Sequence, residues 1–211
     1  MVREFIAGGG VMWFLLFCAV LGLALTLERL YTIFIKIRLN AKTFVAKLIQ
    51  TIEKSGVQTG IELCAKTTSP VARVLKPVLE LQKQSKSRAM MEDAIIKAGT
   101  SELAFLDRSM SLLAGLTTVA PFLGFLGTVT GMIRAFAAVA AIGEVEPTVV
   151  ASGIAEALIT TKWGLIIATP LAIVHILFSG RINGYTKDME TASTQLLDYL
   201  EAKFGVCKTE G

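Results

Sequence analysis

Three ionisable side chains and two threonines stand out because they interrupt apolar stretches of the sequence. Arg134, Glu156 and Lys162 lie within or beside two charge-poor, glycine-rich runs that also contain Thr128 and Thr161. A charged side chain at the centre of a bilayer costs roughly 2.5 to 3.5 kcal/mol on insertion scales, and such groups commonly mark ion pathways or helix contacts. We therefore expect the three ionisable residues to mark an ion pathway or a helix contact.

The two runs belong to a set of apolar blocks that are long enough to cross a membrane. Residues 5–27 and 109–133 contain no charge over 23 and 25 positions, and residues 163–180 contain none over 18. A membrane-spanning helix needs about 20 apolar residues. With a mean hydropathy of +0.62, the sequence predicts an all-α membrane protein with three transmembrane helices and long helical cytoplasmic extensions.

The distribution of basic residues predicts how the chain is oriented. Residues 28–108 contain 14 of the 21 lysines and arginines, whereas the connector near residues 143–147 contains two acids and no base. Because basic residues beside spans stay in the cytoplasm, the N-terminus is expected in the periplasm and the C-terminus in the cytoplasm. Accordingly, the net charge of +4 is interpreted as a topology signal and not as a nucleic-acid interface.

This orientation divides the chain into four parts. Residues 1–27 form the periplasmic N-terminus and first span, and residues 28–108 form a cytoplasmic helical stalk. Residues 109–180 form a transmembrane hairpin, and residues 181–211 form a cytoplasmic C-terminal helix and tail. No small-residue cleavage site follows the first block, so we interpret it as a retained span rather than a signal peptide.

Sites for catalysis or metals are not indicated. The three cysteines and the single histidine have no spacing typical of a metal site, and no nucleophile and base or phosphate-binding loop is recognisable. The sequence therefore predicts no cofactor and no enzymatic activity.

The stalk shows helical periodicity. Phe44, Leu48 and Ile52 recur at helical spacing before a break expected near Gly56 and Gly60, and the periodicity resumes after Ser69 and Pro70, which are typical of a helix start. The resumed stripe contains Val71, Val74, Leu75, Val78, Leu79, Met91, Ile95 and Ala98. Two interpretations are open: the stripe packs the stalk helices together, or it docks another protein.

Folding the hairpin about its connector brings polar residues to common levels. Arg134 and Glu156 each lie eleven positions from Val145, and Thr128 and Thr161 lie 17 and 16 positions from it. The arginine and the glutamate should therefore face each other, and the two threonines should share a deeper level.

Each helix of the hairpin also has a face of small residues, which allows close helix contact within lipid. One face contains Gly124, Thr128, Gly131, Ala135 and Ala138, and the other contains Gly153, Ala157, Thr160, Gly164 and Ala168. Lys162 is expected on the far side of its helix, away from Thr161.

Two interpretations remain open for the polar residues. Glu156 either forms an ion pair with Arg134 that fixes the hairpin, or it is a carboxylate whose protonation is coupled to motion. The hydroxyls of Thr128 and Thr161 either bond to carbonyls four residues earlier in their own helices or line a pathway.

The segments LDRSMSLLAGLTTVAPFLGFLGTVTGMIRAF and GIAEALITTKWGLIIATP resemble the ExbB/TolQ family of proton-driven motor subunits, and more distantly the MotA stators. The resemblance is specific in the hairpin, whereas the stalk agrees only in being helical. Among these subunits the chain looks most like ExbB. Lys162, in place of a small or apolar residue, and Arg134, an added charge, depart from the family pattern.

The resemblance implies a ring-shaped pentamer in the bacterial inner membrane. It would enclose a single-span partner of the ExbD or TolR type that carries a transmembrane aspartate, and a TonB-like protein would receive the mechanical output. Thr128, Thr161 and Glu156 match the proton-pathway positions of the family. A TolQ-like envelope function, a gliding-type motor, a self-contained ion channel and a non-conducting membrane scaffold are the alternatives.

Overall fold

The computed structural model describes residues 2–36, 41–84, 86–142 and 147–205, and all the regular elements in these ranges are helices. The chain divides into two compact units. One contains residues 1–28 and 109–177, and the other contains residues 29–108 and 178–211.

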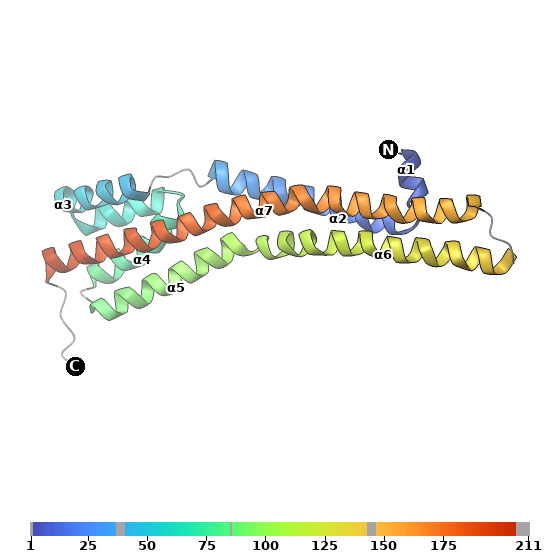
Figure 1. The fold of residues 1–211 in the computed structure, drawn as a ribbon. Helices are drawn as coiled ribbons and strands as arrows, with labels where there is room; N and C mark the ends of the chain where they lie inside the picture. Colours follow the sequence, from blue (N-terminus) through green and yellow to red (C-terminus); the bar gives the residue numbers. More distant parts are fainter. Residues whose placement is uncertain (1, 37–40, 85, 143–146, 206–211) are drawn as a thin grey trace. The chain divides into compact units, whose positions relative to one another are not determined.

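The first unit is built around a helical hairpin. Helix α6 (Met110–Ile142) and the first part of α7 (Pro147–Phe204) run side by side, which confirms the predicted pairing of the second and third apolar blocks (Figure 1). Short helix α1 (Val2–Ala7) and most of α2 (Val11–Leu30) complete the unit. The predicted connector near 143–147 lies outside the described residues, apart from Pro147.

The described part of the chain contains three helical stretches that are long and apolar enough to span a membrane: Val11–Ile33, Arg88–Ala141 and Pro147–Phe204. Each includes most or all of one predicted apolar block, so the expectation of three spans is confirmed. The described part of the chain is also all-α, as predicted.

The first apolar block, residues 5–27, is divided between two helices. Helix α1 ends at Ala7, and α2 begins only at Val11. Gly9 between them has a φ angle of 66°, which glycine adopts without the steric cost of a Cβ atom. A count of uncharged positions cannot detect this break, because the three consecutive glycines are uncharged, as are the helical residues that flank them.

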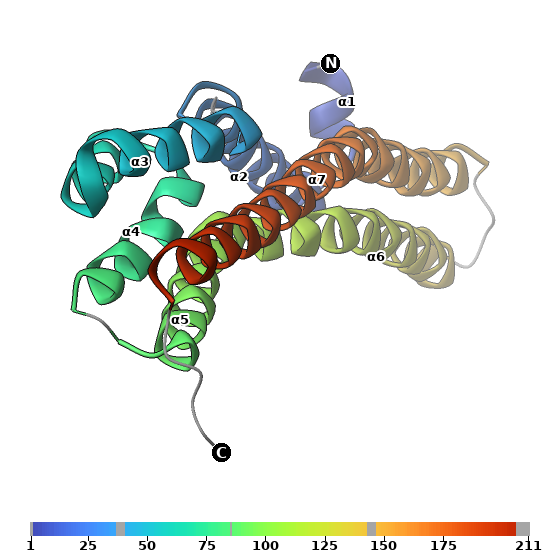
Figure 2. The ribbon, with the colours of Figure 1, turned by 90° about the vertical axis from the view of Figure 1, so that its left-hand side faces the viewer.

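The second unit is a bundle of α3 (Ala41–Lys66), α4 (Pro70–Lys83), α5 (Arg88–Asp107) and the last part of α7 (Figure 2). It also includes the π-helical segment Tyr31–Lys36. Gly56 has φ 82° and ψ 173° inside α3, so the predicted break lies there, whereas Gly60 is helical. Ser69 is the N-cap of α4, as predicted, and Pro77 lies within this helix.

The apolar stripe of the stalk forms the core of this bundle. Leu48, Leu75 and Leu79 are fully buried, and α7 contributes Leu196 and Leu200. The stripe therefore packs the stalk helices against each other, in agreement with the first of the two interpretations given above.

Candidate functional site: the α6–α7 hairpin

Small residues line the contact between α6 and α7. All five members of the predicted α7 face (Gly153, Ala157, Thr160, Gly164 and Ala168) are buried. On α6, Gly124, Gly131 and Ala135 are buried, whereas Thr128 and Ala138 are half-buried. The predicted contact faces are thus essentially correct.

Sequence reasoning missed Gly127, which is also buried in this contact. A Cβ atom at this position would collide with the Thr160 side chain. A signal was present, because Gly124, Gly127 and Gly131 follow one another at steps of three and four, which places them on one face of a helix.

The two backbones approach closely where the glycines meet. A Cβ atom built on Gly164 would lie 2.8 Å from the carbonyl oxygen of Ala120, and one built on Gly124 would lie 3.0 Å from that of Thr160. In lipid, where the hydrophobic effect does not drive helices together, such close packing is a main source of their association.

The threonine hydroxyls are engaged in two different ways. Thr161 Oγ1 donates to the carbonyl oxygen of Gly124 on the other helix at 3.2 Å, so the own-helix interpretation was wrong for this residue. Thr128 Oγ1 donates within its own helix to the carbonyl of Phe125 at 2.6 Å, three residues earlier rather than four. Thr161 is thus level with Gly124, about one helical turn from Thr128 on α6, and the described hydrogen bonds do not join the two threonines.

Arg134 and Glu156 face each other across the hairpin, as the symmetry about Val145 predicted. Arg134 Nη1 donates to Glu156 Oε1 at 2.5 Å. The side chain of Glu156 is 19% exposed and that of Arg134 is 61% exposed. This geometry establishes the ion pair itself, whereas a role for Glu156 in proton movement remains a prediction.

Lys162 has a partner that the sequence did not indicate. Its ammonium donates to Glu4 Oε1 at 2.7 Å, and this hydrogen bond holds the pKa of the Glu4 carboxyl below its usual range. The two residues are 158 positions apart, and no local sequence pattern could have paired them. Lys162 contacts α1 whereas Thr161 contacts α6, so the two side chains have different neighbours, as expected.

Both ion pairs lie level with the segment that precedes α2. A Cβ atom on Gly9 would collide with the Glu156 carboxylate and lie 3.1 Å from Arg134 Nη1, and Glu4 itself belongs to α1. Relative to the first span, both pairs are thus found near its N-terminal end and away from its middle.

Comparison with known proteins identifies the family to which the chain belongs. The sequence profile of the MotA/TolQ/ExbB proton channel family matches residues 66–191. The chain belongs to this family. The matched range includes the whole hairpin, with Thr128, Arg134, Glu156, Thr161 and Lys162, whereas Glu4 and α2 lie outside it. Together with the three long apolar helices, family membership makes the chain a multi-pass membrane protein.

Relatives named ExbB and relatives named TolQ both match the chain. A putative biopolymer transport protein ExbB homolog from Methanothermobacter thermautotrophicus is 27% identical over 86% of this chain and 64% of its own length. The biopolymer transport protein ExbB of Pseudomonas putida is 40% identical over 41% of this chain and 26% of its own length. The Tol-Pal system protein TolQ of Haemophilus influenzae is 37% identical over 41% and 38%, respectively. The chain thus covers less than two thirds of the length of each of these relatives.

Proposed function

We propose that the chain is a proton-channel and motor subunit of an inner-membrane complex that uses the proton motive force to drive an ExbD-like partner. In this proposal the N-terminus lies in the periplasm and the C-terminus in the cytoplasm. Several copies, five by resemblance, form a ring whose α6 and α7 helices surround the partner's span. The output energises TonB-dependent transport across an outer membrane.

The observation that carries this proposal is that the charges of the hairpin are paired. Within residues 109–142 and 147–180, the charged side chains are Arg134, Glu156 and Lys162, and each has a salt-bridge partner. A group that repeatedly gains and loses a proton must be free to do so. The proton carrier is therefore assigned to the partner, as a carboxylic acid in its span.

The threonines then provide a polar surface for that carboxyl group. When it takes up a proton from the periplasmic side, the partner's acid becomes neutral, which lowers the cost of moving it past Thr128 and Thr161. It then releases the proton towards the cytoplasm. A proton crossing roughly 100 mV supplies about 2.3 kcal/mol, so a few protons are enough to shift a partner between two states several kcal/mol apart.

The test is proton flux in proteoliposomes that contain the chain and its single-span partner. Thr161→Ala is expected to reduce flux about tenfold, equivalent to about 1.4 kcal/mol in the barrier, while Thr161→Ser retains the hydroxyl and the flux. Thr169→Ala, an exposed threonine of the same helix, is the matched control. Unchanged flux in Thr161→Ala would contradict the assigned role.

A second candidate is a non-conducting membrane scaffold, favoured by the same ion pairs because they account for the charges without proton movement. It predicts no flux above that of empty vesicles. Subtype is tested separately by deleting the gene: loss of ferric siderophore or vitamin uptake supports the ExbB-like proposal. Detergent sensitivity with normal uptake supports a TolQ-like function in envelope maintenance, and loss of surface movement supports a gliding-type motor.

A further inference from the structure

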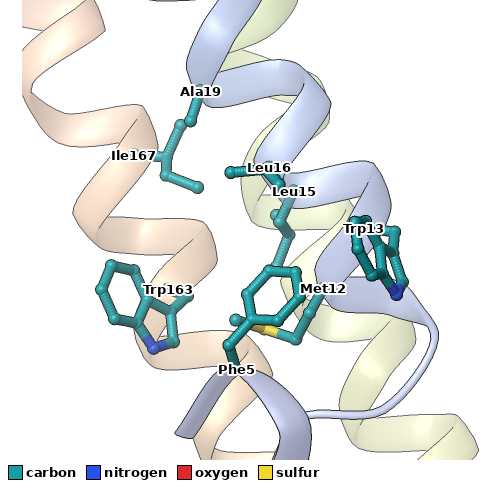
Figure 3. Close-up of a pocket in the computed structure, with 8 residues that line it drawn as sticks. All are labelled: Phe5, Met12, Trp13, Leu15, Leu16, Ala19, Trp163 and Ile167. Carbon is teal, nitrogen blue, oxygen red and sulfur yellow. The ribbon is translucent and has the colours of Figure 1, made fainter. Parts of the chain in front are cut away.

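An apolar cavity of about 350 Å³ lies in the first unit, between α1, α2 and α7. Figure 3 shows its wall, in which Phe5 comes from α1 and Trp163 and Ile167 come from α7. The α2 contribution consists of Met12, Trp13, Leu15, Leu16 and Ala19. The cavity falls within the range of roughly 300 to 1,000 Å³ that is typical of small-molecule sites.

The cavity opens at the surface of the unit and is lined by hydrocarbon. Trp13 and Leu16 are 66% and 43% exposed while also lining it, whereas Met12 and Leu15 at its base are buried. A water molecule needs two to four polar partners, which this wall does not offer. In a membrane, lipid acyl chains are the molecules that surround such an opening.

The position of the cavity along α2 fits one end of a lipid tail. The first span covers 23 residues, about 34 Å of helix, against a hydrocarbon core of about 30 Å. Because nearly the whole span is needed to cross, the first turn of α2, with Met12, lies near a membrane boundary. From Met12 to Ala19 the cavity then extends about 10 Å into the hydrocarbon.

Hydrogen-bond donors lie at the boundary end of the cavity. The Nε1 atom of Trp163 is buried and has no hydrogen-bond partner among the described residues. The Glu4 carboxylate lies close enough for this N–H to help lower the pKa of Glu4, but the hydrogen bond of good geometry at Glu4 Oε1 comes from Lys162 Nζ. An ammonium group has three N–H donors, so Lys162, 48% exposed, retains donors that can bind a further acceptor.

We propose that this cavity is a binding site for one glycerophospholipid per chain. An acyl chain fills the space between Leu15, Ala19 and Ile167, and a phosphate or ester oxygen accepts hydrogen bonds from Trp163 Nε1 and Lys162 Nζ. The site and a phospholipid have the same order of polarity along the membrane normal: the hydrogen-bond donors lie at the membrane boundary, where the headgroup would be, and the apolar wall lies deeper, where the acyl chain would be. The site also joins α1 to the spanning helices, and it does not depend on proton conduction.

Native mass spectrometry of the purified full chain tests the site, with phosphatidylglycerol added to delipidated protein in detergent. We expect one lipid to be retained per chain. Ala19→Phe fills the acyl end of the cavity and should abolish retention. Val20→Phe places the same ring on the adjacent, exposed position and should leave retention unchanged. Helix content by circular dichroism confirms that both variants fold.

Trp163→Phe provides a second test that keeps the aromatic ring and removes only the N–H donor. It should weaken binding about fivefold, the effect of one hydrogen bond, and diacylglycerol, which lacks the phosphate, should bind the original chain more weakly than phosphatidylglycerol. Equal retention in Ala19→Phe and Val20→Phe, or no effect of Trp163→Phe, would overturn the proposal. So would a photo-crosslinker at Leu16 that attaches to a second copy of the chain instead of to lipid.

Discussion

The hydroxyl of Thr161 on α7 donates a hydrogen bond to the backbone carbonyl of Gly124 on α6, with the two oxygens 3.2 Å apart. The carbonyl is reachable because Gly124 has no side chain and the two backbones nearly touch at this level. Close packing and a polar contact are thus combined at one point of the hairpin. This makes Thr161 both a structural residue and a candidate pathway residue, and the two roles can be measured separately.

Replacing Thr161 by valine is expected to destabilise the hairpin. The change keeps the shape of the side chain and removes the donor to Gly124, and interhelical hydrogen bonds in membranes contribute about 0.6 kcal/mol on average and up to about 1.7. Thr130→Val is the matched control, because the described hydrogen bonds of Thr130 go to carbonyls of its own helix. Thermal unfolding of the purified protein should therefore show a larger decrease for Thr161→Val, and equal decreases would argue against the interhelical bond.

Gly164→Ala is expected to force α6 and α7 apart. The added methyl group would lie 2.8 Å from the backbone oxygen of Ala120, and overpacking of this kind costs about 1 to 3 kcal/mol. A Cβ atom at Gly180, on the same helix, would meet nothing within 4 Å, so Gly180→Ala should be neutral or slightly stabilising. Thermal stability measures both variants, and a Gly164→Ala protein as stable as the original would disprove the close contact.

The hairpin could be predicted well because the residues that form its contact recur at helical spacing in the sequence. Small residues at steps of three and four define a contact face, and symmetry about Val145 pairs Arg134 with Glu156. Both arguments need only a helix and a turn. Helical periodicity also predicted the core of the stalk, because most residues of the apolar stripe are buried there.

The N-terminal region could not be predicted in this way. The break at Gly9 depends on a backbone conformation that composition does not reveal, and the pairing of Glu4 with Lys162 joins residues that are 158 positions apart. The cavity beside Trp163 is formed by the consecutive helices α1 and α2 together with α7, which is distant from them in sequence. Such features depend on tertiary packing rather than on local periodicity.

Gly9→Ala is expected to displace the segment between α1 and α2. Alanine at a φ angle of 66° costs roughly 1 to 2 kcal/mol, and the new methyl group would also collide with the carboxylate of Glu156. Gly10→Ala is the control, since a Cβ atom there meets nothing within 4 Å and its φ angle is not positive. Limited proteolysis of the N-terminal residues should be faster in Gly9→Ala than in Gly10→Ala, and equal rates would contradict the tight packing of Gly9.

The buried thiol of Cys64 predicts a dependence of stability on alkaline pH. Burial raises the pKa of this thiol from 9.0 to about 11, so the folded state favours the protonated form. Its contribution is fully present below pH 9, where the thiol is protonated even in the unfolded chain, and is lost as the pH rises towards 11. Cys64→Ala should therefore lose less stability between pH 9 and 11 than the original chain in denaturant unfolding, and parallel curves would contradict the burial effect.

A double-mutant cycle on Arg134 and Glu156 separates the interpretations of this ion pair. Glu156→Gln and Arg134→Gln each leave one charge without its partner, while the double variant removes both. Because the Arg134 side chain is 61% exposed, we expect a coupling of only about 0.5 to 1 kcal/mol in thermal stability. The control is the exposed ion pair of Lys76 and Glu80, whose Nζ and Oε1 atoms are 3.7 Å apart. For this pair we expect a coupling of about 0.3 to 0.5 kcal/mol.

Proton flux measured on the same four proteins then distinguishes structure from function. If Glu156 only fixes the hairpin, the double variant regains both stability and flux, because no charge is left unpaired. If the carboxylate itself takes part in proton movement, the double variant regains stability while its flux stays as low as that of Glu156→Gln. The two measurements must diverge for the functional interpretation to stand, since any purely structural role of the ion pair makes them change together.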